Sequence, residues 1–396
     1  SDRNNILAII REDLQELKRR HANPRRTEIS GEELGEIDLA DLITEETMVV
    51  SISSNGYIKR TPVNAYRAQR RGGKGLRGAG TEEEDPIQHL FVASTHAYLL
   101  FFTNLGKVYW RKVYDLPQLG RYSRGRAIVN LLNLQEGEQI TDCRAVRDFD
   151  RPGHYLVMAT GRGLVKKTDL AAYRRPLRSG LIAIKLREGD ELVDVVVTKP
   201  GDELVLATAS GMAIRFRESD ARPMGRSTSG VKGIGLVGDD RVVGMVVADP
   251  QASLLTACAN GYGKRTPFGP NSTAEQEEGA RENGTDDPIG PAPVEQDEEN
   301  GGLSSQHYYR TQHRGGKGLR DIKTTARNGP VIGIVRVHDE DEIMMVTARG
   351  QIQRVPASDL SIIGRNTMGV RIMNLDEDDT LVAVKRVPPQ DNGGQQ

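Results

Sequence analysis

Six stretches of the chain share one pattern of apolar and polar positions, and this pattern predicts a repeated β-hairpin. Each begins with an apolar run that ends at a glycine: MVVSISSNG (48–56), AYLLFFTNLG (97–106), HYLVMATGRG (154–163), ELVLATASG (203–211), SLLTACANG (253–261) and EIMMVTARG (342–350). A short segment with Lys or Arg follows each glycine, as in YIKRT, KVYWRK, LVKKT, MAIRFR, YGKRT and QIQRV. Because β-branched residues dominate and Gly and Asn end the runs, each unit is predicted to open with two antiparallel strands.

A second glycine marks the later part of each unit. It lies 19, 19, 17, 19, 57 and 19 residues after the first, at Gly75, Gly125, Gly180, Gly230, Gly318 and Gly369. An apolar strand follows, often with an acidic turn (135–139, 187–191, 376–380) and then a closing strand. Four strands in roughly 50 residues cannot cover both faces of their own sheet, so neighbouring units must do so. The pattern predicts an all-β fold, a six-bladed propeller-like ring with about four strands per blade. A straight solenoid is the alternative.

The segments outside the repeat differ in composition. Residues 1–22 place Ile6, Ile10, Leu14 and Leu17 at helical spacing, which predicts a short N-terminal α-helix, and the acidic residues 23–46 are interpreted as a linker. The blades are predicted at roughly 47–92, 93–148, 149–198, 199–248, 249–337 and 338–388, and 389–396 as a tail. The fifth unit holds 38 extra residues, within an acidic stretch at 269–306 that we expect to be a disordered loop because it has almost no large apolar residue. Since the chain begins at Ser1, we expect it to be part of a longer protein.

The formal net charge of −1 averages segments of opposite sign. Residues 1–46 carry a net charge of −5 and residues 269–306 a net charge of −9, so the remaining residues carry +13. A basic body with acidic appendages indicates a polyanionic partner.

Candidate catalytic chemistry is sparse. The seven histidines lack metal-ligand spacing, so neither a metal site nor a cofactor is expected in this domain, and we expect this fragment to be no enzyme by itself. Cys143 and Cys258 each lie in an apolar run and are predicted to be buried thiols of a cytoplasmic protein. No apolar run approaches the length of a membrane span.

One cationic, glycine-rich heptad occurs twice: QRRGGKG at 69–75 and QHRGGKG at 312–318. Glycines let the main chain approach a phosphate closely and offer N–H groups to it. Both heptads are therefore predicted to grip phosphates, through Gln69, Arg70, Arg71, Gly72, Gly73, Lys74 and Gly75 in the first and Gln312, His313, Arg314, Gly315, Gly316, Lys317 and Gly318 in the second.

Other basic residues recur in register after both glycines of each unit. If the units form a ring, equivalent positions lie on one circular track, and a positive belt suits the regularly spaced phosphates of duplex DNA. The predicted rim contacts are Lys59, Arg60, Arg77, Lys112, Arg121, Arg124, Arg126, Arg174, Arg175, Arg178, Arg222, Arg226, Lys232, Lys264, Arg265, Arg320, Arg365 and Arg371.

These residues resemble the C-terminal DNA-wrapping domain of the gyrase A subunit of bacterial DNA gyrase, a type IIA topoisomerase. The heptad QRRGGKG is identical to the box motif of that family, and NGYIKRTP (55–62), FFTNLGKVYW (101–110), GMAIRF (211–216), NGYGKRT (260–266) and GRNTMGV (364–370) are similar to its flanking sequences. The resemblance covers essentially the whole chain, with residues 1–22 similar to the end of the long coiled-coil helix of the cleavage domain.

The resemblance implies a β-pinwheel with strands exchanged between blades. It also implies that duplex DNA wraps around the rim with positive handedness, so that the parent enzyme introduces negative supercoils with ATP hydrolysed by the gyrase B subunit. The expected partners are double-stranded DNA, the rest of a homodimeric gyrase A subunit, and the gyrase B subunit, without a membrane.

Two departures from the family pattern concern the second heptad, where His313 replaces an arginine, and the tail, which lacks an acidic run. We expect a second DNA anchor at 312–318. Two alternative functions are the C-terminal domain of a topoisomerase IV A subunit, which relaxes or decatenates DNA, and a protein-interaction propeller.

Overall fold

The computed structural model describes residues 3–23, 42–53, 55–62, 85, 87–120, 123–175, 177, 179–271, 307–349 and 351–387. The chain divides into two units, Ser1–Thr44 and Glu45–Gln396. In the first unit, helix α1 (Arg3–His21) lies at the place the apolar spacing predicted. Ile6, Ile10, Leu14 and Leu17 of α1 are each about half exposed.

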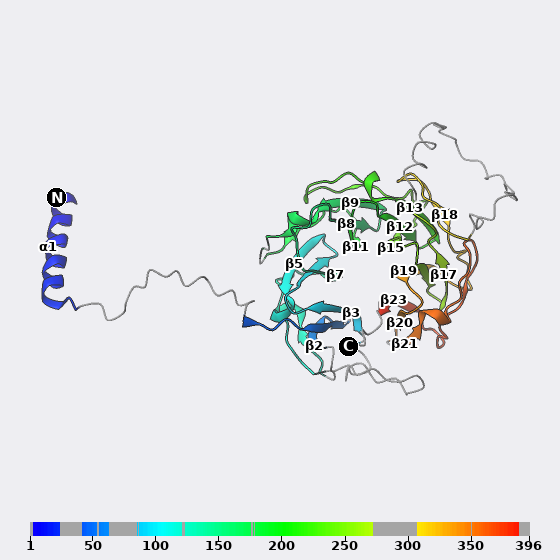
Figure 1. Cartoon of the computed structure of the whole chain (residues 1–396), viewed down its shortest axis with the longest axis horizontal. Coiled ribbons are helices and arrows are strands. Elements are labelled where there is room, and N and C mark those ends of the chain that lie inside the picture. The colour runs from blue at the N-terminus through cyan, green and yellow to red at the C-terminus, as the bar shows by residue number, and fades with distance from the viewer. Residues whose placement is uncertain are drawn as a thin grey trace, which may run out of the picture. The chain divides into compact units, whose positions relative to one another are not determined.

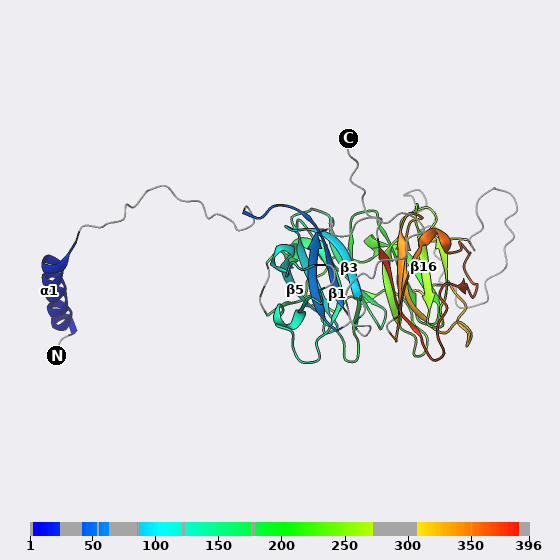
Figure 2. The same cartoon turned by 90° about the horizontal axis from the view of Figure 1, so that it is seen from below.

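The second unit is a ring of six antiparallel sheets (Figure 1). Each sheet contains the hairpin that the repeat predicted and the strand that closes the same unit. The closing strands line the centre, where β7, β11, β15, β19, β23 and β3 follow one another in contact, so the sixth sheet meets the first. Viewed from below, β1, β3 and β16 run between the two faces of the ring (Figure 2). The prediction of a six-bladed ring is confirmed, and a straight solenoid is excluded.

The strand bounds follow the repeat. The hairpins are β1 (Thr47–Ser53) with β2 (Tyr57–Pro62), β4 (Tyr98–Thr103) with β5 (Lys107–Lys112), β8 (Tyr155–Thr160) with β9 (Leu164–Asp169), β12 (Glu203–Thr208) with β13 (Met212–Arg217), β16 (Ser253–Cys258) with β17 (Tyr262–Pro267), and β20 (Glu342–Thr347) with β21 (Ile352–Pro356). The closing strands are β3 (Ile87–Ser94), β7 (Ile140–Val146), β11 (Leu192–Thr198), β15 (Val242–Val247), β19 (Val331–Val337) and β23 (Leu381–Val387).

The fourth strand of a sheet comes from the next unit along the chain. These outer strands are β6 (Arg126–Ala127), β10 (Leu181–Ile182), β14 (Val231–Lys232), β18 (Leu319–Arg320) and β22 (Val370–Arg371). Each has two residues and pairs with the second hairpin strand of the preceding unit, as β6 does with β2. The sixth sheet has three strands in the described part of the chain. The long third strand expected within each unit is therefore wrong: only two residues pair, and they do so with the neighbouring sheet.

Five short 3-10 helices complete the described elements: η2 (Val113–Asp115), η3 (Ile128–Asn130), η4 (Leu170–Tyr173), η5 (Glu218–Asp220) and η6 (Ala357–Asp359). All except η3 directly follow the second strand of a hairpin, and η3 follows the outer strand β6. They turn the chain from one strand toward the next loop.

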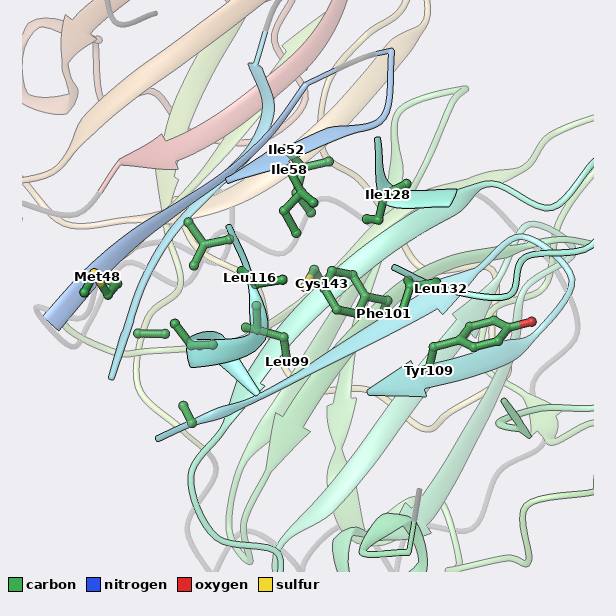
Figure 3. Close-up of a cluster of buried hydrophobic side chains, with 14 residues drawn as sticks. Met48, Ile52, Ile58, Leu99, Phe101, Tyr109, Leu116, Ile128, Leu132 and Cys143 are labelled. Carbon is green, nitrogen blue, oxygen red and sulfur yellow. The ribbon is translucent and has the colours of Figure 1, made fainter. Parts of the chain in front are cut away.

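Apolar side chains fill the spaces between sheets. Figure 3 shows the cluster between the first two sheets, which includes Ile52 and Ile58 of the first sheet and Phe101 and Tyr109 of the second. Similar clusters join the second sheet to the third, the third to the fourth, the fourth to the fifth and the fifth to the sixth. Cys143 and Cys258 are buried and free, as predicted. Burial of this surface is the main stabilising contribution to the ring.

Charged residues of the inner strands join neighbouring blades. The carboxylate of Asp142 accepts the N–H of Val195 at 3.0 Å, and that of Asp194 accepts the N–H of Met245 at 3.0 Å. Arg144 forms ion pairs with both carboxylates. Burial raises the pKa of Asp142 to about 7, although the charge of Arg144 opposes this shift. These groups line a central cavity of about 1070 Å³, but their hydrogen bonds hold the blades together.

Candidate nucleic-acid interface

The outer strands present cations to solvent. Arg126 on β6, Lys232 on β14, Arg320 on β18 and Arg371 on β22 are all exposed. The remaining described outer strand, β10, carries Ile182 at the position of Lys232, Arg320 and Arg371, and Ile182 is 52% exposed. Because each outer strand is the edge of its sheet, its side chains lie at the periphery of the ring. Lys232, Arg320 and Arg371 therefore occupy equivalent places on the outer strands of the third, fourth and fifth sheets, whereas Arg126 lies one residue earlier in its strand, because Ala127 pairs with Tyr57 at that place.

The loops that lead into the outer strands carry further cations. Arg124, Arg174, Arg175 and Arg222 are exposed, whereas Arg226 and Arg365 are half-buried. Arg124 stacks over the ring of Tyr57 at 4.2 Å, Arg174 pairs with Asp150 at 3.3 Å, and Arg365 donates from Nε to the carbonyl of Tyr308 at 2.7 Å. These loops therefore combine cations that face solvent with cations that already have a protein partner.

The second glycine-rich heptad lies against the loop of the fourth unit. Arg314 donates from Nε to the carbonyl of Asp220 at 3.1 Å and from Nη1 to that of Lys232. The N–H of Gly315 donates to Gly233, and the carbonyl of Gly316 accepts from Gly235. His313 and Lys317 are exposed, and Gln312 is half-buried. The heptad therefore joins two blades through its backbone and Arg314, and it leaves His313 and Lys317 at the surface.

The glycines of this heptad meet a geometric requirement. Gly318 has φ +77°, and a Cβ there would lie 2.4 Å from the carbonyl oxygen of Ala213. Gly315 also has a positive φ, at +90°. Residues with a Cβ rarely adopt this conformation, so the close approach of the heptad to β13 depends on glycine.

Three lysines at one position of the first, third and fifth units lie inside the ring. Lys59 is 3% exposed, and Lys166 and Lys264 are 0% exposed. Each ammonium donates to a main-chain oxygen in the loop of the following unit, which belongs to Ser123, Arg226 and Gly364 respectively. The prediction that Lys59 and Lys264 lie on the exposed rim is wrong, because the loop of the next unit covers them and supplies their hydrogen-bond acceptors.

Burial changes the proton affinity of these lysines. Burial, together with the smaller effect of the nearby charge of Arg226, lowers the pKa of Lys166 to about 7. Lys264 differs because Asp321 lies 2.9 Å away, and Asp321 also accepts hydrogen bonds from Thr256 and Tyr309. Burial lowers the pKa of Lys264 as well, but the charge of Asp321 opposes the shift.

The next residue of the strand is a cation in five of the six units: Arg60, Lys167, Arg215, Arg265 and Arg354. Arg265 is 3% exposed, and its Nε donates to the carbonyl of Leu360 at 2.9 Å. Arg60 is half-buried and makes the equivalent bond to Leu116 at 2.8 Å. Arg215 and Lys167 are buried and pair with Glu203 and Glu218. The exposed-rim prediction is therefore wrong for Arg265 and only half met for Arg60, since both side chains hold the following loop.

Lys112 occupies a different environment. Its ammonium lies 3.5 Å from the centre of the Tyr98 ring and donates to the carbonyl of His96 at 3.0 Å. Lys112 is half-buried and fixed to its own hairpin. Gln69, Arg70, Arg71, Gly72, Gly73, Lys74, Gly75, Arg77, Arg121 and Arg178 lie outside the described residues.

The sequence model of the family described as "DNA gyrase C-terminal domain, beta-propeller" matches residues 47–94, 97–147, 154–199, 202–249, 309–338 and 341–388. The six matched segments follow the six repeat units. The chain belongs to this family. Its sequence resemblance to the gyrase A C-terminal domain is thereby confirmed.

Several longer relatives of this chain are DNA gyrase A proteins. The chain is 40% identical to the DNA gyrase A protein of Salmonella typhimurium over 96% of its length, and 43% identical to that of Escherichia coli over 92%. It is 39% identical to that of Mycolicibacterium smegmatis over 98%. It spans about two fifths of the length of these relatives, at 39%, 37% and 41%.

Solved structures have the same fold. The structure of a DNA gyrase A C-terminal domain superposes with a TM-score of 0.64 at 25% identity, covering 86% of this chain and 99% of that one. The C-terminal domain of a DNA topoisomerase IV superposes with a TM-score of 0.65 at 23% identity, covering 88% and 95%. The second comparison shows the fold alone.

Two further observations on this gyrase-family chain concern metal ligands and membrane-spanning helices. Within the described ranges, no three His, Cys, Asp or Glu side chains gather as metal ligands. None of the helices in those ranges has the length and apolar character to cross a membrane.

Sequence reasoning missed Arg327, which is exposed and donates from Nε to the hydroxyl of Tyr262 at 3.0 Å. The turn sequences of the repeat units contained a signal for this residue. The fifth unit of this gyrase-family chain has KTTARNG (323–329) where other units have acidic turns, such as REGDE (187–191).

Proposed function

We propose that the ring binds duplex DNA along its outer edge and bends it around the blades. The observation that carries this proposal is the repeated placement of an exposed cation on an outer strand, at Arg126, Lys232, Arg320 and Arg371. Phosphates recur regularly along a duplex, so Lys232, Arg320 and Arg371, at equivalent positions of three successive sheets, match a continuous backbone track. Such contacts position DNA without reading its sequence. Bending 20–30 base pairs by 40–90° costs about 1–6 kcal/mol, so several contacts are required.

The wrapping is proposed to have positive handedness, so that the parent protein introduces negative supercoils. Support comes from relatives of the whole length, which are DNA gyrase A proteins. In this proposal the chain is the DNA-wrapping part of a homodimeric gyrase A subunit, which forms an ATP-dependent type II topoisomerase with the gyrase B subunit in the cytoplasm. The fragment itself contributes no catalytic group and no cofactor.

Topology analysis tests the wrapping directly. Nicked circular DNA is religated in the presence of the chain, and the linking number of the products is measured. Positive wrapping shifts the products toward positive linking difference in proportion to bound protein. An unchanged distribution, at concentrations where DNA is bound, would contradict wrapping while leaving binding intact.

The first glycine-rich heptad, residues 69–75, allows a second test of the wrapping. Replacing Arg70, Arg71 and Lys74 together with alanine is expected to abolish the linking-number shift if this heptad anchors the wrap. A topoisomerase IV domain is the alternative: supercoiling by the full-length holoenzyme distinguishes it, because only gyrase introduces negative supercoils into relaxed circles.

Salt dependence distinguishes the proposal from a protein-interaction propeller. The logarithm of the DNA affinity is expected to fall with the logarithm of salt concentration, with a slope of about −0.9 for each phosphate neutralised. A binding surface for a protein would give weak DNA binding without such a slope.

A further inference from the structure

The fifth blade brings two arginines to one tyrosine hydroxyl. Tyr262 begins β17, and Arg371 lies directly opposite it on β22 in the strand register. Arg371 donates from Nη2 to Tyr262 Oη at 3.1 Å, and Arg327 donates from Nε to the same oxygen at 3.0 Å. The two guanidinium groups also lie 5.2 and 5.4 Å from the centre of the Tyr262 ring. A single buried side chain therefore positions two exposed cations.

The loop that carries Arg327 is fixed by its own hydrogen bonds. Asn328 is fully buried, and its side-chain amide donates to the carbonyls of Lys323 and Met368. Its side-chain oxygen accepts from the backbone and hydroxyl of Thr325. Asn260 in the adjacent hairpin turn donates to the carbonyl of Arg327 itself. The position of Arg327 is therefore set before any ligand arrives, which lowers the entropic cost of binding.

The equivalent turns of other units have the opposite charge. Asp190, Asp240 and Asp379 lie ten residues after the second glycine of their units and accept the N–H of the adjacent hairpin turn, at Arg162, Ser210 and Arg349 respectively. Asn328 takes this place in the fifth unit, where the N–H of Asn260 donates to its main-chain oxygen instead. The fifth unit therefore has the same turn as the other units but lacks their aspartate carboxylate.

The net charge of this turn in the fifth unit also differs from that in other units. Residues 376–379 read DEDD and residues 187–191 read REGDE, whereas residues 323–329 read KTTARNG, with two cations and no acidic residue. Among the described ion pairs, neither Arg327 nor Arg371 has a carboxylate partner. Their surroundings therefore favour an anion at this end of the fifth blade and repel one at the same end of the third and sixth blades.

We propose that Arg327, Arg371 and Tyr262 clamp one phosphodiester of duplex DNA at the turn end of the fifth blade. Guanidinium groups match the oxygens of a phosphate and form charge-assisted hydrogen bonds to it. The Tyr262 hydroxyl accepts from both arginines and keeps its own proton to donate to a phosphate oxygen. The clamp rests on the proposed function and extends it: the duplex crosses the turn end of the ring at blade five, where no acidic turn repels it.

Binding titrations across salt concentrations test the clamp on the whole chain. The variants are R327Q, R371Q and the double variant, with a 40-base-pair duplex as the probe. Each single variant is expected to weaken binding by about three- to tenfold at low salt. Because both arginines contact the same phosphate, the double variant is expected to lose little more than one single variant, with the salt slope reduced by about 0.9.

Two further variants separate the clamp from a general loss of charge or fold. R187Q removes an exposed cation from the acidic turn of the third unit, and it is expected to leave affinity and slope unchanged. Y262F keeps the ring and removes the shared hydroxyl, so it is expected to weaken binding by about two- to threefold. Thermal unfolding of each variant confirms that the ring is intact.

The outcomes separate the two proposals. If the parent chain binds duplex DNA without a salt slope, the proposed function is wrong. If the parent chain binds with the expected slope and the double arginine variant keeps that slope and affinity, the proposed function stands and the clamp is wrong. Equal losses in R327Q and R187Q also overturn the clamp, because they show a diffuse charge effect.

Discussion

Two sets of cations each recur at a fixed place in the repeat unit of this chain, and their surroundings are opposite. Lys59, Lys166 and Lys264 lie on the second strand of a hairpin and are almost completely buried. Lys232 and Arg320 lie on outer strands and are exposed. The first set donates to main-chain oxygens of the next loop, whereas the second faces solvent at the edge of a sheet.

The difference shows that similar cations have two roles in the ring: buried ones hold loops in place, and exposed ones face solvent. A buried lysine fixes the loop of the following unit, and that loop leads into the outer strand that completes the lysine's own sheet. The buried lysines of the first, third and fifth units therefore hold the outer strands β6, β14 and β22 in place. The two sets predict separable effects: changes to the first alter the stability of the ring, and changes to the second alter DNA binding.

The largest expected effect is on the buried network around Lys264. Asp321→Ala removes the carboxylate that accepts from Lys264, Thr256 and Tyr309, and it leaves a buried cation unpaired. The free energy of unfolding is expected to fall by about 3–5 kcal/mol, measured by urea denaturation. The control is Asp239→Ala on an exposed turn, which is expected to change it by less than about 0.5 kcal/mol. An equal effect of the two variants would contradict the structural role of the buried set.

The second glycine-rich heptad leads into the outer strand β18, which carries Arg320, and it gives the next largest effect. Gly318→Ala places a Cβ 2.4 Å from the Ala213 oxygen at a φ of +77° and is expected to destabilise the ring by about 2–3 kcal/mol. Gly316→Ala, two residues earlier, places its Cβ 3.6 Å from the nearest atom and is expected to cost about 0.5 kcal/mol or less. Thermal denaturation compares the two, and a similar shift in both would show that conformational freedom is not what the heptad requires.

Lys166 gives a pH-dependent effect of intermediate size. Its pKa is lowered to about 7 in the folded chain, so the unfolded chain binds more protons at this site between pH 7 and about 10.5. Stability from this site therefore rises as pH rises through that range. Between pH 7 and 9.5, the unfolding free energy of the parent chain is expected to gain about 3 kcal/mol relative to Lys166→Met. A constant difference between the two proteins would show that Lys166 keeps its proton when buried.

The exposed set gives the smallest effect on stability. The double variant Lys232→Gln, Arg320→Gln is expected to unfold within about 0.5 kcal/mol of the parent chain. Its DNA affinity is expected to fall, and its salt slope to decrease by about 1.8, because two phosphate contacts are lost. Arg151→Gln, on the exposed turn between β7 and β8, is the charge-matched control and is expected to leave the slope unchanged. A parental slope in the double variant would contradict the outer track.

The repeat predicted the ring because hairpin, glycine turn and closing strand are local patterns, and each occurs in register. Strand exchange was not predicted from spacing, since the outer strands have two residues and their pairing depends on a neighbouring sheet. The exposure of cations was predicted correctly at Lys232 and wrongly at Lys264, although each recurs at a fixed place in the repeat unit. What decides between them is the loop that covers Lys264, and a loop's position depends on contacts far apart in sequence.

The acidic segment of the fifth unit leaves and re-enters the ring at one fixed point. Arg215 donates from Nη1 to the carbonyl oxygens of Phe268 and Tyr309, on either side of residues 272–306, and the N–H of Tyr309 donates to Phe268. With both ends held together, the cost of closing the intervening chain grows only slowly with its length, by about 0.6 kcal/mol for each doubling. This position is therefore suited to the insertion of a reporter domain. Such a domain would report on a complex of the protein with DNA and would leave the fifth blade intact.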